Sequence, residues 1–169
     1  MENSVEAVTA RLSNRKVAVP LSDAVKDLRE RGFGEINKRC LHFAPTEALY
    51  LAEKGRIKVL DGKGTPLSLH DLAKRLAADK YESWIKYLIY RDLRDRGYIV
   101  RGTSRFDFEV QGKGALRRLV TIIHEGRDAS LARMGELLRY SQKEKKELVL
   151  AVIDRRTDIV YYTLDSLSI

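Results

Sequence analysis

The sequence predicts a mixed α/β protein, of the α+β kind, made of two small domains that span residues 1–78 and 79–169. Apolar residues recur at helical spacing in some segments, whereas other segments are short runs rich in β-branched and aromatic residues. The two kinds of segment alternate along the chain, and an Ala-Asp-Lys stretch at 78–80 separates its halves. The apolar content of 44% is enough to form a hydrophobic core.

The first half is predicted to contain short strands and helices bounded by glycine and proline. Gly32 and Gly34 end the first helix, and Pro45 occupies the first turn of the second. Ser68, with Asp71 three residues later, resembles a capping box that opens the third helix. The expected elements are strands at 16–19, 41–43 and 57–60 and helices at 21–31, 45–54 and 68–77.

The second half begins with the strongest helix pattern, at 81–96. Its apolar residues lie on or near one face, and opposite charges four residues apart, such as Asp92 and Arg96, lie on the other. Gly97 ends this helix. Strands are expected at 98–101, 106–111, 117–123, 147–153 and 159–163, with a helix at 130–142. This order predicts one sheet that helices can cover.

The charge of the chain suits a polyanionic partner. Thirty-two Lys and Arg against 24 Asp and Glu leave a net charge of +8, and basic surfaces bind nucleic acid because neutralised phosphates release counterions. The equally open alternative is a charged surface that serves solubility or heat tolerance through ion-pair networks. If the basic residues bind phosphates, the strand and turn candidates along one sheet edge are Arg101, Arg105, Lys113 and Lys146.

Other chemistries find little support in the sequence. Cys40 is the only cysteine, which excludes an internal disulfide and a cysteine-based zinc site and fits a reducing, cytoplasmic location. The three histidines are isolated from other metal-ligand residues, and no glycine-rich loop predicts a cofactor. No run approaches the ~20 apolar residues that span a bilayer, and the first residues lack a signal-peptide pattern. We therefore expect no metal, no cofactor and no membrane association.

Three segments carry a resemblance to a known family. They are YLIYRDLRDRGYIVRGTSRFDFEV at 87–110, KELVLAVIDRRTDIVYYTL at 146–164 and RGFGEINKRCLHFAPTEALYLAEKGRIKVLDGKGTPLS at 31–68. In order and spacing they closely resemble the archaeal tRNA-splicing endonucleases. The resemblance implies a C-terminal domain with a nuclease-like mixed sheet flanked by helices, and metal-independent cleavage of precursor tRNA at a bulge–helix–bulge. In that reaction a 2′-hydroxyl attacks the adjacent phosphate, which leaves a 2′,3′-cyclic phosphate and a 5′-hydroxyl.

Active members of this family use a tyrosine, a histidine and a lysine, and only the lysine matches here, as Lys146. Gln111 stands where the tyrosine ends the FDFEV strand, and Ala115 stands where the histidine opens the next strand. A Gln amide cannot accept a proton near neutral pH, and an Ala methyl cannot donate one. A general acid and a general base each raise the rate of such a reaction by about 10²- to 10⁴-fold. We therefore expect a degenerate site with a vestigial Lys146, in a chain that is not an enzyme on its own.

The resemblance also implies partners. A structural subunit of this family joins a catalytic paralogous subunit in a two-plus-two heterotetramer, in which its last strand pairs with a partner's strand. Val160, Tyr161 and Tyr162 would then lie at the subunit interface, where pairing covers an apolar edge that otherwise promotes aggregation. Asp154 and Asp158 of the DRRTD loop would dock into a basic cleft of an opposing subunit.

Two alternatives stay open. The chain could be an active tRNA-splicing endonuclease with a site remodelled around Tyr140, His124 and Lys146, or it could be a stand-alone RNA-binding module. Cleavage of precursor tRNA by the chain alone would favour the first alternative. A chain that stays monomeric beside a candidate partner would favour the second.

Overall fold

A computed structural model of the chain describes residues 6–166. They form two compact units, one up to Tyr87 and one from Leu88, and the division falls inside helix α4 (Lys80–Asp95). The sequence predicted a boundary at 78–80, where the chain enters this helix. Within residues 6–166, no helix combines the length and the apolar character that a membrane span requires.

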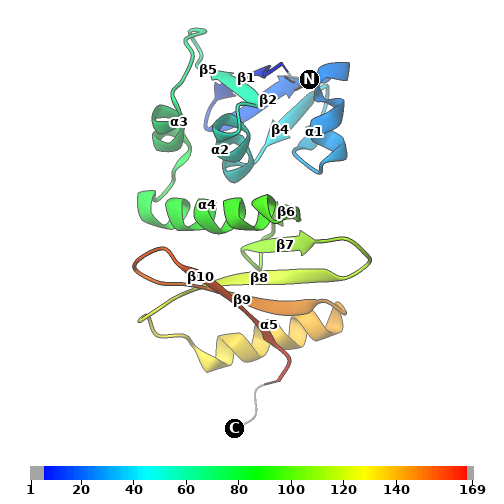
Figure 1. Cartoon of the computed structure of the whole chain (residues 1–169), viewed down its shortest axis with the longest axis vertical. Coiled ribbons are helices and arrows are strands. Elements are labelled where there is room, and N and C mark those ends of the chain that lie inside the picture. Colours follow the sequence, from blue (N-terminus) through cyan, green and yellow to red (C-terminus); the bar gives the residue numbers. More distant parts are fainter. Residues whose placement is uncertain (1–5, 167–169) are drawn as a thin grey trace. The chain divides into compact units, whose positions relative to one another are not determined.

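The N-terminal unit is a five-stranded sheet with its own core, accompanied by short helices (Figure 1). The strand order is β3-β4-β2-β1-β5, in which β1 and β5 are parallel and the other neighbours are antiparallel. The elements are β1 (Val8–Ser13), β2 (Lys16–Pro20), η1 (Asp23–Val25), α1 (Lys26–Glu30), β3 (Glu35–Asn37), β4 (Cys40–Phe43), α2 (Pro45–Glu53), β5 (Ile57–Leu60) and α3 (Leu69–Leu76).

Strand β1 was missed in the sequence because its turn lacks the usual signal. Ser13 pairs with Lys16, so the loop between β1 and β2 consists of Asn14 and Arg15 alone. Both have positive φ angles, 47° and 61°, as a type I′ hairpin turn requires. Glycine is the usual residue at the second position of that turn, because it adopts a positive φ easily. With arginine at that position, the sequence does not indicate a hairpin turn. The three-residue edge strand β3 was also missed.

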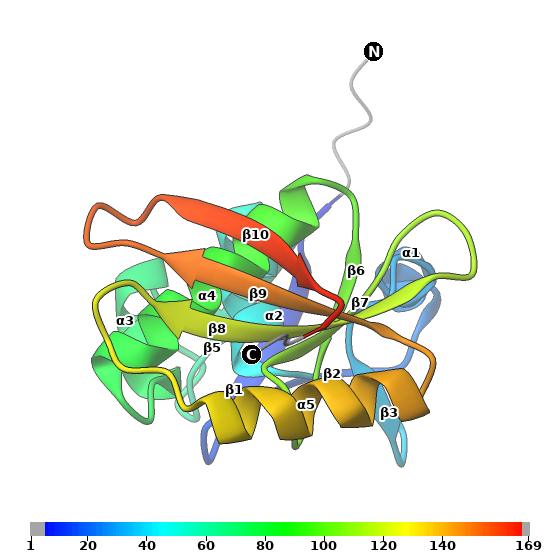
Figure 2. The same ribbon diagram turned by 90° about the horizontal axis from the view of Figure 1, so that it is seen from below.

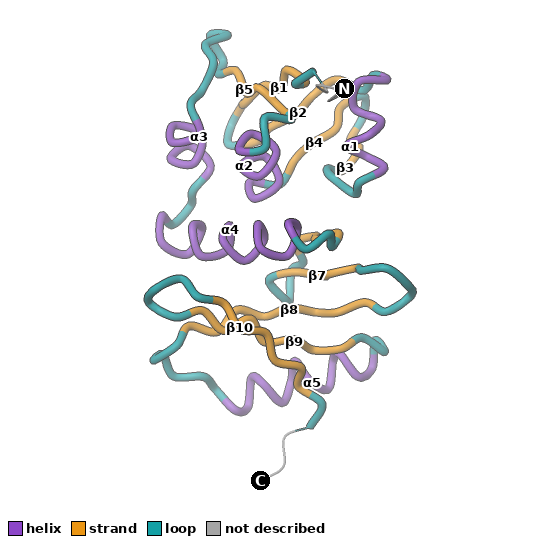
Figure 3. Tube along the Cα trace, viewed as in Figure 1, coloured by secondary structure: helices purple, strands orange, loops and turns teal. Residues whose placement is uncertain are grey.

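The C-terminal unit is a five-stranded mixed sheet in the order β10-β9-β8-β7-β6. Its inner pair β8–β9 is parallel, and the remaining neighbours are antiparallel. Parallel strands need a crossover, and helix α5 supplies it along one face of the sheet (Figures 2 and 3). The elements are β6 (Ile99–Gly102), β7 (Phe108–Gln111), β8 (Arg117–His124), α5 (Leu131–Lys143), β9 (Glu147–Ile153) and β10 (Ile159–Leu164). The predicted mixed fold is confirmed.

The two faces of this sheet are covered by different helices. Phe108 of β7 packs against Tyr90 in the C-terminal half of α4, with ring centres 5.9 Å apart. On the opposite face, Leu119 and Leu148 form a cluster with residues of α5 such as Leu137. Because neighbouring residues of a strand point to opposite faces, the residue that follows Phe108 points to the α5 side.

Candidate functional site

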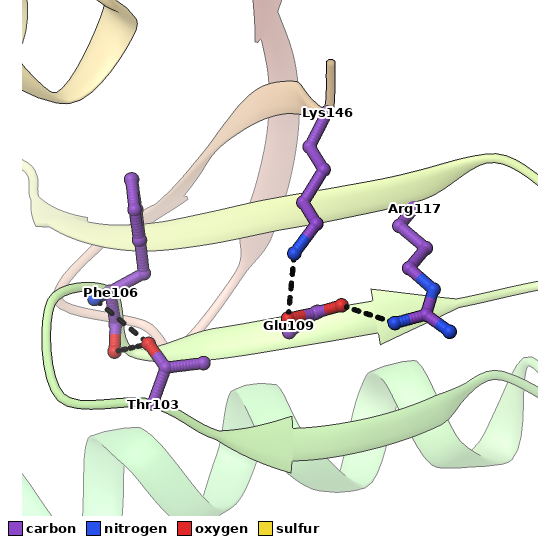
Figure 4. Close-up of polar contacts among 5 residues, drawn as sticks. All are labelled: Thr103, Phe106, Glu109, Arg117 and Lys146. Carbon is purple, nitrogen blue, oxygen red and sulfur yellow. Dashed lines mark hydrogen bonds and ion pairs between the residues drawn. The ribbon is translucent and has the colours of Figure 1, made fainter. Parts of the chain in front are cut away.

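A carboxylate and two cations form an ion-pair cluster on the α5 side of the sheet (Figure 4). Glu109 accepts a hydrogen bond from Lys146 Nζ through Oε2 and another from Arg117 Nη1 through Oε1, each at 3.2 Å. The side chains of Glu109 and Lys146 are only 24% and 22% exposed, whereas that of Arg117 is 53% exposed. The Glu109–Lys146 pair is therefore better shielded from water than an ordinary surface ion pair.

The register of three strands brings the cluster together. Strands β7 and β8 are antiparallel, which puts Arg117 opposite Gln111 and close to Glu109 on the same face. Strands β8 and β9 are parallel and their register begins with Arg118 opposite Glu147, so Lys146, the residue just before β9, lies beside Arg117. The three members of the cluster thus come from separate elements that meet at one end of the sheet.

The turn that ends α5 fixes the backbone of Lys146. The N–H of Lys146 donates to the carbonyl of Ser141 at 2.9 Å, and the N–H of Lys145 donates to the carbonyl of Gln142 at 3.1 Å. Lys145 itself has a left-handed φ of 55°. This pairing is the Schellman ending of a helix, and it leads directly into β9.

The two positions predicted to be degenerate lie near the cluster. Gln111 is the exposed last residue of β7, two residues beyond Glu109 on the same face. Ala115 is exposed in the turn between β7 and β8, two residues before Arg117. Neither an amide nor a methyl group acts as an acid or a base near neutral pH. These two positions therefore supply no acid or base beside Lys146.

His124 lies at the other end of β8, where it pairs with Ile153. A strand rises about 3.3 Å per residue, so roughly 20 Å of β8 separate His124 from the end that carries Arg117. His124 lines a separate pocket of 230 Å³ with Asp107, Arg133 and other residues. Among residues 6–166, no three side chains of His, Cys, Asp or Glu gather in a way that could hold a metal ion.

The four basic residues predicted to contact RNA do not share one sheet edge. Arg101 is exposed on the edge strand β6, Lys113 is exposed in the β7–β8 turn, and Lys146 belongs to the cluster. Arg105 precedes β7 at its other end, where its guanidinium lies 4.4 Å from the centre of the Tyr140 ring. Antiparallel strands send successive turns to opposite ends of a sheet, so Arg105 and Lys113 lie at different ends.

Sequence reasoning missed Glu109 and the role of Arg117. Glu109 stands between the buried residues Phe108 and Val110, and a charged residue in such a strand is stabilised by a cross-strand partner of opposite charge. That signal was present in the sequence. Choosing Arg117 and Lys146 as the partners required the register of β7, β8 and β9, which the sequence does not state.

The edge strand β10 presents two different sides. Val160 and Tyr162 are 49% and 54% exposed. Tyr161 points the other way, and its hydroxyl donates to Asp92 Oδ2 at 2.7 Å while the Arg96 guanidinium lies 5.3 Å from its ring centre. Burial, reinforced by the hydrogen bond to the Asp92 carboxylate, raises the pKa of Tyr161. One tyrosine therefore holds β10 to α4, and the other is open to solvent.

The turn between β9 and β10 is organised by Asp154. Its Oδ1 accepts the backbone N–H groups of Arg156 at 2.8 Å and Asp158 at 2.9 Å. Thr157 adopts a φ of 70° to close the turn. The side chains of Arg156 and Asp158 are exposed. Of the two predicted docking aspartates, Asp154 is thus engaged within the turn, whereas Asp158 lies on its surface.

The two halves of the chain match two domains of one family. Residues 8–73 match the N-terminal domain of the tRNA intron endonuclease, and residues 83–161 match its catalytic C-terminal domain. The tRNA-splicing endonuclease of Pyrococcus furiosus is 39% identical over 160 residues, which cover 91% of this chain and 93% of that protein. Proteins of the same name from Thermococcus onnurineus and Methanococcus vannielii are 35% and 28% identical, over 95% and 100% of this chain and 96% and 99% of their own lengths. With both domains and nearly the whole length in agreement, the chain belongs to the tRNA-splicing endonuclease family.

Proposed function

We propose that this chain is the structural, non-catalytic subunit of a heteromeric tRNA-splicing endonuclease. It helps to assemble the complex and to hold precursor tRNA, while a related subunit cleaves at the intron boundaries and leaves 2′,3′-cyclic phosphate and 5′-hydroxyl ends. The observation that carries the proposal is the content of the site, where Gln111 and Ala115 supply no proton-transfer group and Lys146 is paired with Glu109.

The cleavage chemistry explains why this content matters. Attack by a 2′-hydroxyl needs a base to take its proton, an acid to protonate the leaving oxygen, and a cation to stabilise the extra charge on the phosphate. A general acid and a general base each raise the rate by about 10²- to 10⁴-fold, so a site without both should have almost no catalytic activity. Lys146 could supply only the cation, and its ammonium group is already hydrogen-bonded to a carboxylate.

The geometry disfavours an active site remodelled around Tyr140, His124 and Lys146. His124 and Lys146 lie at opposite ends of the β8–β9 pair, roughly 20 Å apart at about 3.3 Å per residue. A general acid or base must come within hydrogen-bond reach of the reacting oxygen. The Tyr140 ring contacts Phe106, with ring centres 5.7 Å apart, and the guanidinium of Arg105.

The exposed side of β10 favours a subunit over a stand-alone RNA-binding module. An edge strand with unpaired backbone groups and exposed apolar side chains promotes association with another chain, and Val160 and Tyr162 are such side chains. Pairing of β10 with the equivalent strand of a catalytic paralogue, in a two-plus-two heterotetramer, would cover both. Asp158, exposed at the adjacent turn, is then the residue placed to dock into a basic cleft of an opposing subunit.

Co-purification followed by a cleavage assay tests the proposal. This chain, a paralogue from the same organism that carries the full triad, and the mixture of the two would each be incubated with a precursor tRNA that contains a bulge–helix–bulge. We expect a complex and cleavage from the mixture, with 2′,3′-cyclic phosphate ends, and no cleavage from this chain alone. Cleavage by this chain alone, or a mixture in which the two chains remain separate, would overturn the proposal.

A further inference from the structure

The cluster around Glu109 resembles an anion-binding site in which the protein's own carboxylate is the bound anion. Its two cations, Lys146 and Arg117, each donate to a different oxygen of one carboxylate. A phosphodiester presents the same features to such cations, since it too offers two anionic oxygens for charge-assisted hydrogen bonds. We propose that Glu109 is an internal competitor that occupies the place of an RNA phosphate between Lys146 and Arg117. The inference rests on the proposed function, in which this chain touches precursor tRNA without cutting it.

The position of Glu109 makes the competition persistent. Its backbone is held in β7 by pairing with β6 on one side and β8 on the other, and its neighbours Phe108 and Val110 are buried. The strand therefore cannot move the carboxylate away from the cations. The Schellman turn similarly fixes the backbone of Lys146. The carboxylate and the ammonium group are tethered to the same sheet, so they meet at high effective concentration.

A phosphate that reached Lys146 Nζ would lie within a few ångströms of the Glu109 carboxylate. Like charges at that separation repel, and the repulsion is stronger where water is partly excluded. The low exposure of Glu109 and Lys146, 24% and 22%, provides that partial exclusion. Bound RNA is therefore expected to contact basic residues away from Glu109, such as the exposed Lys113 of the β7–β8 turn, and not Lys146.

Substitution of Glu109 should open the site. In Glu109→Gln the amide keeps the size of the side chain but loses the charge, so Lys146 and Arg117 become available to RNA. The matched control is Glu147→Gln, which removes the same charge from the Arg118–Glu147 pair between β8 and β9, where the two side chains are 2.9 Å apart. Its effect on affinity measures the benefit of one negative charge less together with one freed arginine, Arg118.

The experiment measures binding of this chain to a precursor tRNA with 2′-deoxynucleotides at both splice sites. Without the attacking hydroxyls the RNA cannot be cleaved, so binding is read separately from catalysis. Fluorescence anisotropy over a series of KCl concentrations gives the affinity and its salt dependence. For Glu109→Gln we expect about three- to tenfold tighter binding than for Glu147→Gln, and a salt slope steeper by about 0.7 to 0.9, the value of one added phosphate contact.

Lys146→Ala provides the decisive comparison. It should change affinity no more than Lys143→Ala does in the wild-type background, but it should abolish the gain in the Glu109→Gln background. An equal effect of Lys146→Ala in both backgrounds, or equal affinities for Glu109→Gln and Glu147→Gln, would overturn the inference. If circular dichroism shows that Glu109→Gln does not fold, the comparison of Lys146→Ala with Lys143→Ala in the wild-type background decides. A larger loss of RNA affinity in Lys146→Ala than in Lys143→Ala would mean that Lys146 already binds RNA, and would overturn the inference. Cleavage of unmodified precursor by this chain would contradict the proposed function and leave these binding results interpretable.

Discussion

The hydroxyl of Tyr161 donates a 2.7 Å hydrogen bond to Oδ2 of Asp92 and thereby ties the edge strand β10 to helix α4. Asp92 also accepts a hydrogen bond from Arg96 at 2.9 Å, and Arg96 lies over the Tyr161 ring. The three side chains hold the inner side of β10 in place. The outer side, with Val160 and Tyr162, is thus presented on a strand whose position is fixed.

Tyr161→Phe should lower the free energy of unfolding by about 1 to 2 kcal/mol, because it removes a partly buried hydrogen bond to a charged acceptor. Arg96 still satisfies Asp92, which places the loss toward the lower end of that range. Urea unfolding followed by circular dichroism measures it. In an Asp92→Ala background the same substitution should cost much less, and an undiminished cost there would show that the hydroxyl acts through another contact.

The same contact predicts a pH dependence. Burial and Asp92 raise the pKa of Tyr161 above its unfolded value of about 10, so the fold favours the protonated hydroxyl. The stabilisation is fully present below that unfolded value and is lost as the pH rises toward the folded pKa. The difference in unfolding free energy between wild type and Tyr161→Phe should be equal at pH 7 and pH 8.5 (within error) and should shrink above about pH 10. A difference that grew with pH would contradict this assignment.

The exposed side of β10 should be required for assembly. Val160→Asp or Tyr162→Asp puts a charge where an apolar partner strand is proposed, and Pro at position 161 removes a backbone donor from the strand. Size-exclusion chromatography with light scattering, in the presence of the catalytic partner, should show monomers or aggregates. Leu131→Asp is the control, because Leu131 is 71% exposed on α5 and lies outside β10. An unchanged complex in all three β10 variants would exclude this strand as the interface.

Lys146→Ala should scarcely alter cleavage by the assembled complex, because its ammonium group is paired with Glu109 and no acid or base stands at positions 111 and 115. Single-turnover cleavage of precursor tRNA measures the rate. The corresponding lysine of the catalytic partner is the positive control, and its replacement by alanine should slow cleavage strongly. A loss of a hundredfold or more from Lys146→Ala in this chain would mean that the residue is not vestigial.

Asp154 and Asp158 should have separable effects. Asp154→Ala removes the acceptor of two backbone N–H groups and should destabilise the chain itself by about 1 to 2 kcal/mol, whereas Asp154→Asn, which keeps an acceptor oxygen, should cost less. Asp158→Ala should leave the fold intact and loosen the tetramer in a salt-sensitive way, since a docked carboxylate acts through charge-assisted hydrogen bonds. Normal tetramers of the double alanine variant at high salt and low protein concentration would assign docking to another segment.

The helices and most strands followed from local signals in the sequence. The Ser68 cap is an example, since its hydroxyl accepts the N–H of Asp71 as the capping box predicts. Strand β1 did not follow, because its hairpin turn uses Asn14 and Arg15 in place of a glycine. Strand β7 begins at Phe108, two residues later than predicted, and the Asp107 carboxylate there accepts the N–H of Ile122 at 2.8 Å in place of a backbone carbonyl.

The candidate site was predictable only in part. Gln111, Ala115 and Lys146 were found by resemblance, which works position by position along the chain. The Glu109 cluster depends on which residues face each other across β7, β8 and β9, and residues 109 and 146 are 37 positions apart. A parallel pairing through a helical crossover leaves no mark in the local pattern of either strand, so no periodicity could have paired Glu109 with Lys146.

The parallel pairing of β8 with β9 also constrains the order in which the C-terminal unit can fold. The edge of β8 that pairs with β9 has no partner until α5 and β9 have been synthesised. Pairings between segments so far apart in the sequence form slowly. During synthesis the run Leu119–Ile123 is therefore open on its β9-facing edge, although its antiparallel partner β7 has already been made. Strand β10, which comes last in this sheet, can align only after β9 is in place. The surface proposed to meet another subunit is consequently the last part of the sheet to form, so an incomplete nascent chain has no interface to offer.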